Sequence, residues 1–396
     1  MSADEIPAVS FEEASVLADA RGRHGGADFE DTSFLEPLRH LLADLDAAPL
    51  HAGGRFGQYE RIIASLGVRL TFEDYCRRHP EILDEEIVAP LVVVGQTRTG
   101  TTRLHRLLAS DPGLYSAHWW EVRSPAPFPD WDGTPPDPRI AEAHEQVRII
   151  LETQPVLASI HPWDAEGPDE EIMLMEHTFL SQVPESSTHI PNYFAWIDEQ
   201  DWTGCYAYLK KLLQFLQWQK HRRGETADRW VLKTPAHLGY IDTMLEIFPG
   251  AVFIQTHRDP LETVASSASM YAALWGMSQD EVDHAEIGRQ TVERFSWGLR
   301  RNMASRRRLK DEGFVDVWFA DVGRDALGEL RRIYDEIGRE LTPEAEAAMK
   351  AWLRDNAREK RPAHRYTLEQ FGLTREHVES TFSEYRERFI LSRSDP

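Results

Sequence analysis

An α/β fold built on a doubly wound parallel sheet is predicted by three features of this 396-residue sequence. Short runs rich in β-branched residues alternate with segments of helical periodicity, and each run stops at Gly or at polar residues. The first run leads through a Gly-bearing turn directly into a helix start. Because 41% of the residues are hydrophobic, the chain can bury a substantial core. In such a fold, ligands bind at the carboxyl ends of the strands.

The first strand–turn–helix unit begins at Pro90. Residues 91–94 read Leu-Val-Val-Val and stop at Gly95, as a strand buried on both faces would. After Thr101, leucines recur at helical spacing until Asp111-Pro112-Gly113 ends the helix. The sequence therefore predicts a buried parallel strand followed by a short helix.

Three further strands are predicted downstream, at 230–232, 251–256 and 315–319. The first is followed by a helix that Pro249-Gly250 ends, and the last by a helix with an apolar face. After the middle strand, Asp259 is expected to cap a helix, with Pro260 at its first position and Glu262 completing a capping box. Strands and helices therefore alternate along the chain, which favours a parallel sheet.

The remaining segments are predicted to surround this sheet. Residues 1–88 are acidic and lack strand alternation, so we interpret them as a helical N-terminal extension to an α/β domain at 89–396. Residues 114–228 form a large insertion between the first two strand units. It opens with a proline-rich loop and contains a predicted helix at 206–223.

Charge and cysteine content narrow the function classes. With 44 basic and 66 acidic residues, the net charge of −22 argues against a nucleic-acid-binding protein. Cys76 and Cys205 are too far apart in sequence to form a CxxC motif. The first residues do not read as a signal peptide, and no apolar run approaches the roughly 20 residues of a membrane span. We expect a cytoplasmic protein without a membrane span.

The turn at 95–102, Gly-Gln-Thr-Arg-Thr-Gly-Thr-Thr, has the setting of a phosphate-binding loop. Its glycines allow backbone N–H groups to curl toward an anion, and the following helix start adds partial positive charge. Thr101 stands where a nucleotide P-loop carries its lysine, and the cation is Arg98 instead. The strand at 251–256 is followed by His257-Arg258 and offers no Walker B acid. An ATPase is therefore disfavoured.

Three motifs in order resemble those of sulfotransferases that use 3′-phosphoadenosine 5′-phosphosulfate (PAPS). Residues 98–102 resemble the R/K-S-G-T-T loop that holds the 5′-phosphosulfate, and Arg258 and Ser266 resemble the pair that grips the 3′-phosphate. Residues 230–235 resemble the lysine-containing segment of the tyrosylprotein type, while His364-Arg365-Tyr366 and 371–373 are similar to a bacterial branch. The match covers 90 to about 267.

This resemblance implies a P-loop-like sulfotransferase fold, PAPS as donor, adenosine 3′,5′-bisphosphate (PAP) as product and no metal. The catalytic cations would be Arg98 and Lys233, which neutralise charge on the leaving phosphate. The residues expected to bind the donor are Gln96, Thr97, Arg98, Thr99, Gly100, Thr101, Thr102, Arg258 and Ser266.

The acceptor hydroxyl must also lose a proton to a general base. Glu121 and His118 follow the first helix, about where tyrosylprotein-type enzymes carry their glutamate, although Glu121 is two residues late. His237 would lie one helical turn from Lys233, with an ordinary pKa near 6.5 that suits a base. The choice among these three residues stays open.

The acceptor is expected to be a largely apolar small molecule bound by the insertion. Six tryptophans of the insertion could line a pocket, namely Trp119, Trp120, Trp131, Trp163, Trp196 and Trp202. The acidic segment 161–177 is interpreted as a lid or acceptor-binding loop, since its spacing fits no metal motif.

Two alternative functions remain, a P-loop kinase or NTPase and a non-catalytic nucleotide-binding module. Whether the protein forms a homo-oligomer also stays open.

Overall fold

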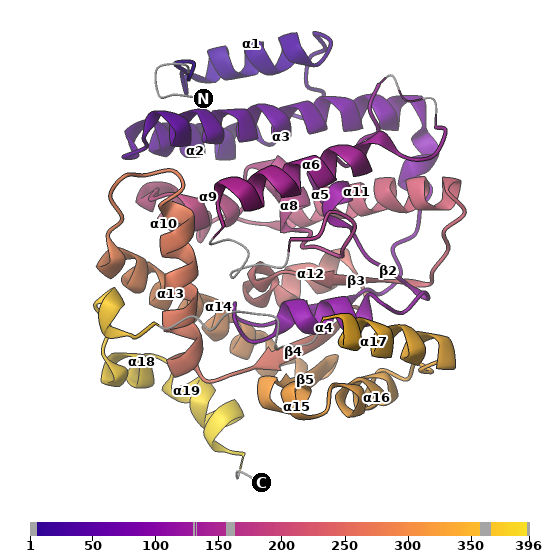
Figure 1. The fold of residues 1–396 in the computed structure, drawn as a ribbon, viewed down its shortest axis with the longest axis vertical. Helices are drawn as coiled ribbons and strands as arrows, with labels where there is room; N and C mark the ends of the chain where they lie inside the picture. Colours follow the sequence, from indigo (N-terminus) through magenta and orange to yellow (C-terminus); the bar gives the residue numbers. More distant parts are fainter. Residues whose placement is uncertain (1–5, 130, 132, 156–162, 357–365, 394–396) are drawn as a thin grey trace.

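A five-stranded parallel sheet forms the centre of the molecule (Figure 1). The computed structural model describes residues 6–129, 131, 133–155, 163–356 and 366–393. The strand order β2-β3-β1-β4-β5 places the first predicted strand in the middle. The strands are β1 (Leu91–Val94), β2 (Leu114–Tyr115), β3 (Arg229–Lys233), β4 (Val252–His257) and β5 (Phe314–Trp318). The predicted doubly wound α/β fold is confirmed.

Successive residues of the central strand pack into different halves of the core. Leu91 and Val93 contact a cluster built with helices α4 (Thr101–Leu108), α16 (Ala326–Glu336) and α17 (Pro343–Asp355). Val92 and Val94 belong to the larger cluster on the other face. Both faces of the sheet are therefore covered, and for this reason the strand sequence shows no polar alternation.

Strand register brings the ends of three strands to one edge. Val93 of β1 is level with Lys233 of β3, and Val94 is level with Gln255 of β4. The turn after β1, the last residue of β3 and the segment after β4 therefore meet at the carboxyl edge of the sheet. The sequence did not predict the two-residue edge strand β2, which is too short to show a pattern.

The N-terminal segment is helical, as expected, and occupies one end of the molecule (Figure 1). Its buried side chains, such as Leu66, belong to the same cluster as Val92 of the sheet, so it shares a core with the α/β part. Its division from the rest at residue 88 stays a prediction. The elements are α1 (Glu13–Arg23), α2 (Leu35–Ala47), α3 (Ala52–Arg78) and the 3-10 turn η2 (Pro80–Asp84).

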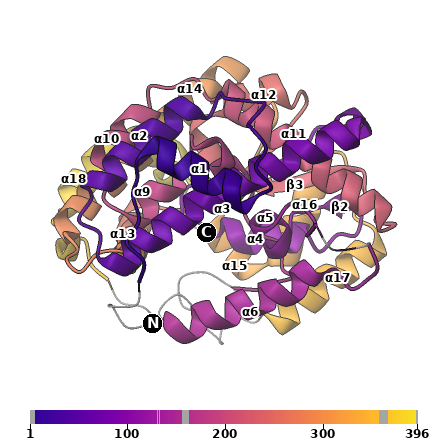
Figure 2. The same ribbon diagram turned by 90° about the horizontal axis from the view of Figure 1, so that it is seen from above.

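The insertion is mostly helical, and its predicted long helix is confirmed as α11. Figure 2 shows α6 along one side of the molecule. His161 lies outside the described residues. The insertion elements are α5 (Trp119–Arg123), α6 (Pro138–Thr153), α8 (Ile172–Met175), η3 (Glu176–Thr178), α9 (Val183–Ser187), α10 (Pro191–Ile197) and α11 (Thr203–Arg222).

Helices after β3 complete the fold, and α18 and α19 lie toward the end opposite α1 (Figure 1). Asp259 caps α13 as predicted, but Glu262 pairs with Arg258 and does not complete a capping box. Of the predicted family motif, His364 and Arg365 lie outside the described residues. The elements are η4 (Pro235–Gly239), α12 (Ile241–Ile247), α13 (Pro260–Trp275), α14 (His284–Leu309), α15 (Phe319–Arg324), η6 (Glu369–Phe371), α18 (Arg375–Thr381), α19 (Ser383–Arg386) and η7 (Glu387–Leu391).

Candidate active site

The turn between β1 and α4 has the backbone of an anion-binding loop. Gly100 is the N-cap of α4 with φ 93°, and Gly95 has φ 152°. A Cβ at Gly95 would lie 2.2 Å from Oγ1 of Thr256, so the loop packs directly on β4. The first N–H groups of a helix have no acceptor within it and are available to an anion.

Side-chain hydroxyls fix the shape of this loop. The Thr99 hydroxyl donates to the Gln96 carbonyl at 2.6 Å and lies 2.6 Å from Oγ1 of Thr256. Thr97 and Ser267 share a hydrogen bond between their hydroxyls, 2.5 Å apart. The loop is therefore tied to both β4 and α13 by hydrogen bonds within the protein.

The predicted donor-binding residues from separate parts of the chain come together here. Arg98 donates from Nε to Oγ of Ser266 at 3.0 Å. Arg258 donates from Nη1 to the Arg98 carbonyl at 3.0 Å, and its guanidinium lies 4.1 Å from the centre of the Phe319 ring. Two arginines and a buried serine thus surround one side of the loop.

Lys233 lies on the other side of the loop, at the end of β3. Its ammonium donates to the Thr102 hydroxyl at 3.1 Å and forms an ion pair with Glu170. The backbone N–H of Lys233 donates to Glu171 at 2.9 Å. The insertion therefore delivers two consecutive carboxylates to the end of this strand.

The structure corrects the proposed position of His237. The ring is fully buried, with Nε2 2.5 Å from Glu171 and Nδ1 2.9 Å from the Tyr206 hydroxyl. Residues 235–239 form a 3-10 helix, so the α-helical spacing from Lys233 that was expected does not apply. Because both ring nitrogens already have partners inside the core, we do not propose His237 as the base.

Glu121 and His118 also lie elsewhere. One Glu121 oxygen accepts from Lys220 and the other from Arg223, both at 2.8 Å, and the carboxyl further accepts from the backbone N–H of His118. Burial alone would raise the pKa of this carboxyl, but the neighbouring positive charges, Lys220 first, hold it at about 2. Neither residue is among the described residues that line the cavity below. Their predicted catalytic role is therefore set aside.

Replacing Glu121 with glutamine should destabilise the protein by about 3 to 5 kcal/mol, because it leaves buried cations without their partner. The folded-state pKa lies below the ordinary 4.5, so this stabilisation is complete above pH 4.5 and is lost as pH falls toward 2. Denaturant unfolding measures the effect. Glu225→Gln, which removes a half-exposed carboxylate from the same cluster, should cost less than about 1 kcal/mol. Unchanged stability with lost turnover would return Glu121 to the catalytic candidates.

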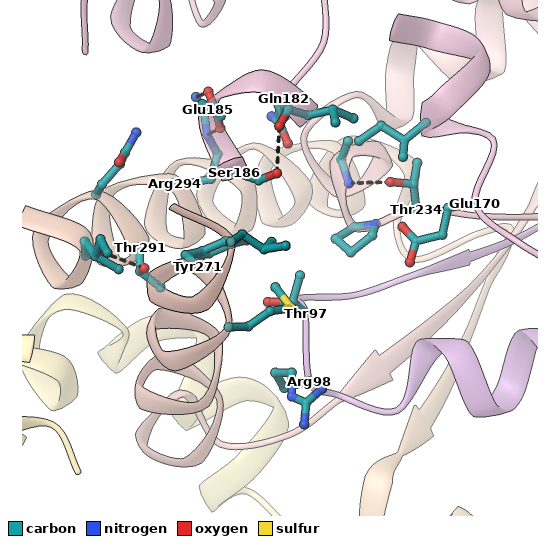
Figure 3. Close-up of a pocket in the computed structure, with 18 of the residues that line it drawn as sticks. Thr97, Arg98, Glu170, Gln182, Glu185, Ser186, Thr234, Tyr271, Thr291 and Arg294 are labelled. Atoms are coloured by element: carbon teal, nitrogen blue, oxygen red, sulfur yellow. Dashed lines mark hydrogen bonds and ion pairs between the residues drawn. The ribbon is translucent and has the colours of Figure 1, made fainter. Parts of the chain in front are cut away.

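A cavity of about 260 Å³ opens beside the loop and Glu170 (Figure 3). Thr97 and Arg98 lie at one side of it, and Glu185 and Arg294 at another (Figure 3). Between them, burial raises the pKa of Tyr271 to about 12, so its phenol is neutral. Apolar side chains supply much of the wall, namely Ile172, Met173, Val183, Phe194, Met270, Leu274, Trp275 and Ile287.

A sequence model described as "Sulfotransferase family" matches residues 90–343. This range contains the loop, Lys233, Arg258 and the cavity wall. The chain belongs to the sulfotransferase family. It is a sulfotransferase enzyme of bacterial type, as the resemblance in its motifs implied.

Relatives and solved structures agree with this assignment. The sulfotransferase is 25% identical over 320 residues to the omega-hydroxy-beta-dihydromenaquinone-9 sulfotransferase Stf3 of Mycobacterium tuberculosis and of Mycobacterium bovis, covering 79% of this chain and 78% of theirs. Its structure resembles sulfotransferase STF9 from Mycobacterium avium, with TM-score 0.86, 29% identity and coverage of 96% and 97%. STF1 from M. tuberculosis gives TM-score 0.82, 29% identity and coverage of 94% and 98%.

Glu170 is the site residue that sequence reasoning did not single out. It lay within the acidic segment interpreted as a lid or acceptor loop, and no spacing distinguishes it from Glu166 or Glu171. Only the contact with Lys233, 63 residues away, identifies it. Among the described residues, no group of three or more His, Cys, Asp or Glu side chains could hold a metal. No described helix is both long and apolar enough to cross a membrane.

Proposed function

We propose that this sulfotransferase moves a sulfuryl group from PAPS to a hydroxyl of a largely apolar small molecule. The observation that carries the proposal is the Lys233–Glu170 ion pair, which lies between the anion-binding loop and the apolar cavity. Lys233 would supply a cation for the leaving group, and Glu170 would supply a base for the acceptor. Both side chains lie where the donor and the acceptor would meet.

The donor side fits a phosphosulfate. The close packing of Gly95 on β4 and the open N-terminus of α4 form a cradle for a 5′-phosphate. Following the family resemblance, Arg258 and Ser266 would hold the 3′-phosphate. Residues 96–102 would line the rest of the donor site. PAPS supplies an activated sulfuryl group joined to a phosphate, which leaves as part of PAP.

For the reaction, Glu170 takes the proton from the acceptor hydroxyl, so that the oxygen can bond to sulfur. Lys233 and Arg98 stabilise the negative charge that gathers on the phosphate oxygen as its bond to sulfur breaks. The loop holds the two reactants in line. All of these groups belong to the protein, and their chemistry is proton transfer and charge stabilisation.

An apolar acceptor is supported by the cavity wall and by the relatives. The name of Stf3 describes an omega-hydroxylated menaquinone derivative, a hydrophobic hydroxyl compound. The apolar residues of the cavity beside Glu170 would accept a molecule of the same general character. We further propose a cytoplasmic location, where the free thiols of Cys76 and Cys205 would stay reduced.

Two other functions are less well supported. A P-loop kinase or NTPase would use a lysine in place of Thr101 and an acid at the end of β4, where His257 instead stacks with Phe389. A non-catalytic nucleotide-binding module would have no use for a carboxylate held against Lys233 at the cavity. Turnover of ATP with Mg²⁺ would favour the first, and PAP binding without transfer to any acceptor would favour the second.

Calorimetric titration of the purified protein tests the donor. We expect micromolar binding of PAP and no comparable signal from ATP with Mg²⁺. Arg258→Ala should weaken PAP binding roughly 10- to 100-fold, the value of a charge-assisted hydrogen bond. Arg289→Ala, which removes an exposed arginine with a similar i,i+4 glutamate partner, is the control and should change nothing. Unchanged affinity in Arg258→Ala would overturn the donor-site assignment, and binding of ATP with Mg²⁺ alone would overturn the function.

A further inference from the structure

We propose that the acceptor carries an acidic group remote from its reacting hydroxyl, and that Arg123 binds this group in a second cavity. The inference rests on the proposed function, because it extends the acceptor site from Glu170. It names the acceptor class as amphipathic hydroxy acids, in which an apolar chain separates a hydroxyl from a carboxylate or a similar anion.

The second cavity has a volume of about 460 Å³ and adjoins the first. Glu170, Ile172, Met173 and Leu274 line both. The catalytic carboxylate therefore stands at the junction, with apolar side chains leading away from it on both sides. A chain whose hydroxyl reaches Glu170 can extend from there into the second cavity.

The far wall of this cavity comes from segments outside the donor site. Trp119 and Trp163 contribute aromatic surface, and the centres of their rings lie 6.4 Å apart. On the N-terminal helix α3, Gly57 lines the cavity, and a Cβ built there would meet no atom within 4 Å. The wall is thus apolar and open enough to accept an extended chain.

Arg123 is the charged side chain that this wall leaves for a ligand. It lines the cavity and is exposed. Its guanidinium lies 5.8 Å from the centre of the Trp119 ring. No described carboxylate forms an ion pair with it.

Other charges of the cavity already have partners. Arg61 pairs with Glu176, Glu170 pairs with Lys233, and Asp169 accepts from the backbone N–H of Glu170 at 2.6 Å. A carboxylate, sulfate or phosphate matches the planar donors of a guanidinium in pairs. Arg123 therefore favours an acceptor with an anion at this end, which a purely apolar alcohol lacks.

The test compares two series of probes. Omega-hydroxy fatty acids of eight to sixteen carbons and their methyl esters are offered with PAPS, and kcat/KM is measured by PAP formation. We expect the wild type to prefer the best acid over its ester at least tenfold. Arg123→Gln should abolish this preference and leave ester turnover unchanged, whereas Arg148→Gln, on the exposed face of α6, should behave as wild type. An equal acid-to-ester ratio in wild type and Arg123→Gln would overturn the inference.

A binding measurement separates this inference from the proposed function. Dodecanoate is titrated into the enzyme–PAP complex, and Arg123→Gln should bind it at least tenfold more weakly than wild type. Absent or unchanged dodecanoate binding overturns the inference, while failure of PAP itself to bind overturns the proposed function. As an independent variant, Gly57→Leu should fill the cavity, slow the longest probes at least tenfold and spare the shortest. Unchanged turnover of the longest probes in Gly57→Leu would also count against the second cavity.

Discussion

Replacing Glu170 with glutamine is expected to lower kcat by about 10²- to 10⁴-fold, the usual contribution of a general base. Glutamine keeps the shape of the side chain but cannot take the acceptor proton. Affinity for PAP should stay within a few-fold of wild type, because the loop contacts of Arg98, Arg258 and Ser266 remain. Single-turnover sulfation with calorimetry in parallel measures both quantities.

The division of the effect between kcat and KM distinguishes this role from a structural one. Loss of a base lowers kcat, whereas loss of a positioning contact raises KM. Glu166→Gln, in the same acidic segment but exposed and paired with His144, is the matched control and should keep both kcat and KM. A Glu170→Gln enzyme with normal kcat and raised KM would mean that the carboxylate positions Lys233 and is not the base.

Lys233→Ala is the second large effect, with kcat expected to fall by about 10²- to 10³-fold. The charge of the leaving phosphate would lose its cation on the β3 side, while Arg98 would remain on the other. Because the lysine also pairs with Glu170, the double variant should lose less than the product of the single effects.

Lys350→Ala removes an exposed, ion-paired lysine and serves as control. Rapid-quench measurement of the transfer step would distinguish slow chemistry from weak donor binding. A Lys233→Ala enzyme that transfers at the wild-type rate would remove the lysine from the mechanism. Strictly additive effects in the double variant would mean that the two side chains act independently.

The parts of this fold that could be predicted from sequence are those with local causes. Residues 91–94 form a buried strand because both of its faces are covered, and this leaves an uninterrupted apolar run. The anion-binding loop at 95–102 could also be predicted, because the left-handed Gly100 and the start of α4 lie within a few residues of each other. The approach of Arg98 to Ser266 followed from matching motifs in order, which fixed their relative positions in a known arrangement.

The proposed base, Glu170, could not be predicted because its contact with Lys233 depends on packing between segments 63 residues apart. In the same way, Lys220 and Arg223 contact Glu121 from 99 and 102 residues away in the sequence. Neither partner reveals the other in sequence. The α-helical spacing expected between Lys233 and His237 does not apply, because residues 235–239 form a 3-10 helix, and the His237 side chain is buried.

The adjacent carboxylates Glu170 and Glu171 bear on how substrates enter. Glu171 is 1% exposed and holds both the backbone of Lys233 and the ring of His237, so it fastens the insertion to the sheet edge. These contacts hold this part of the insertion against the end of β3. An acceptor that reaches Glu170 would therefore enter along the two cavities that Glu170 lines, and the sulfated product would leave by the same route.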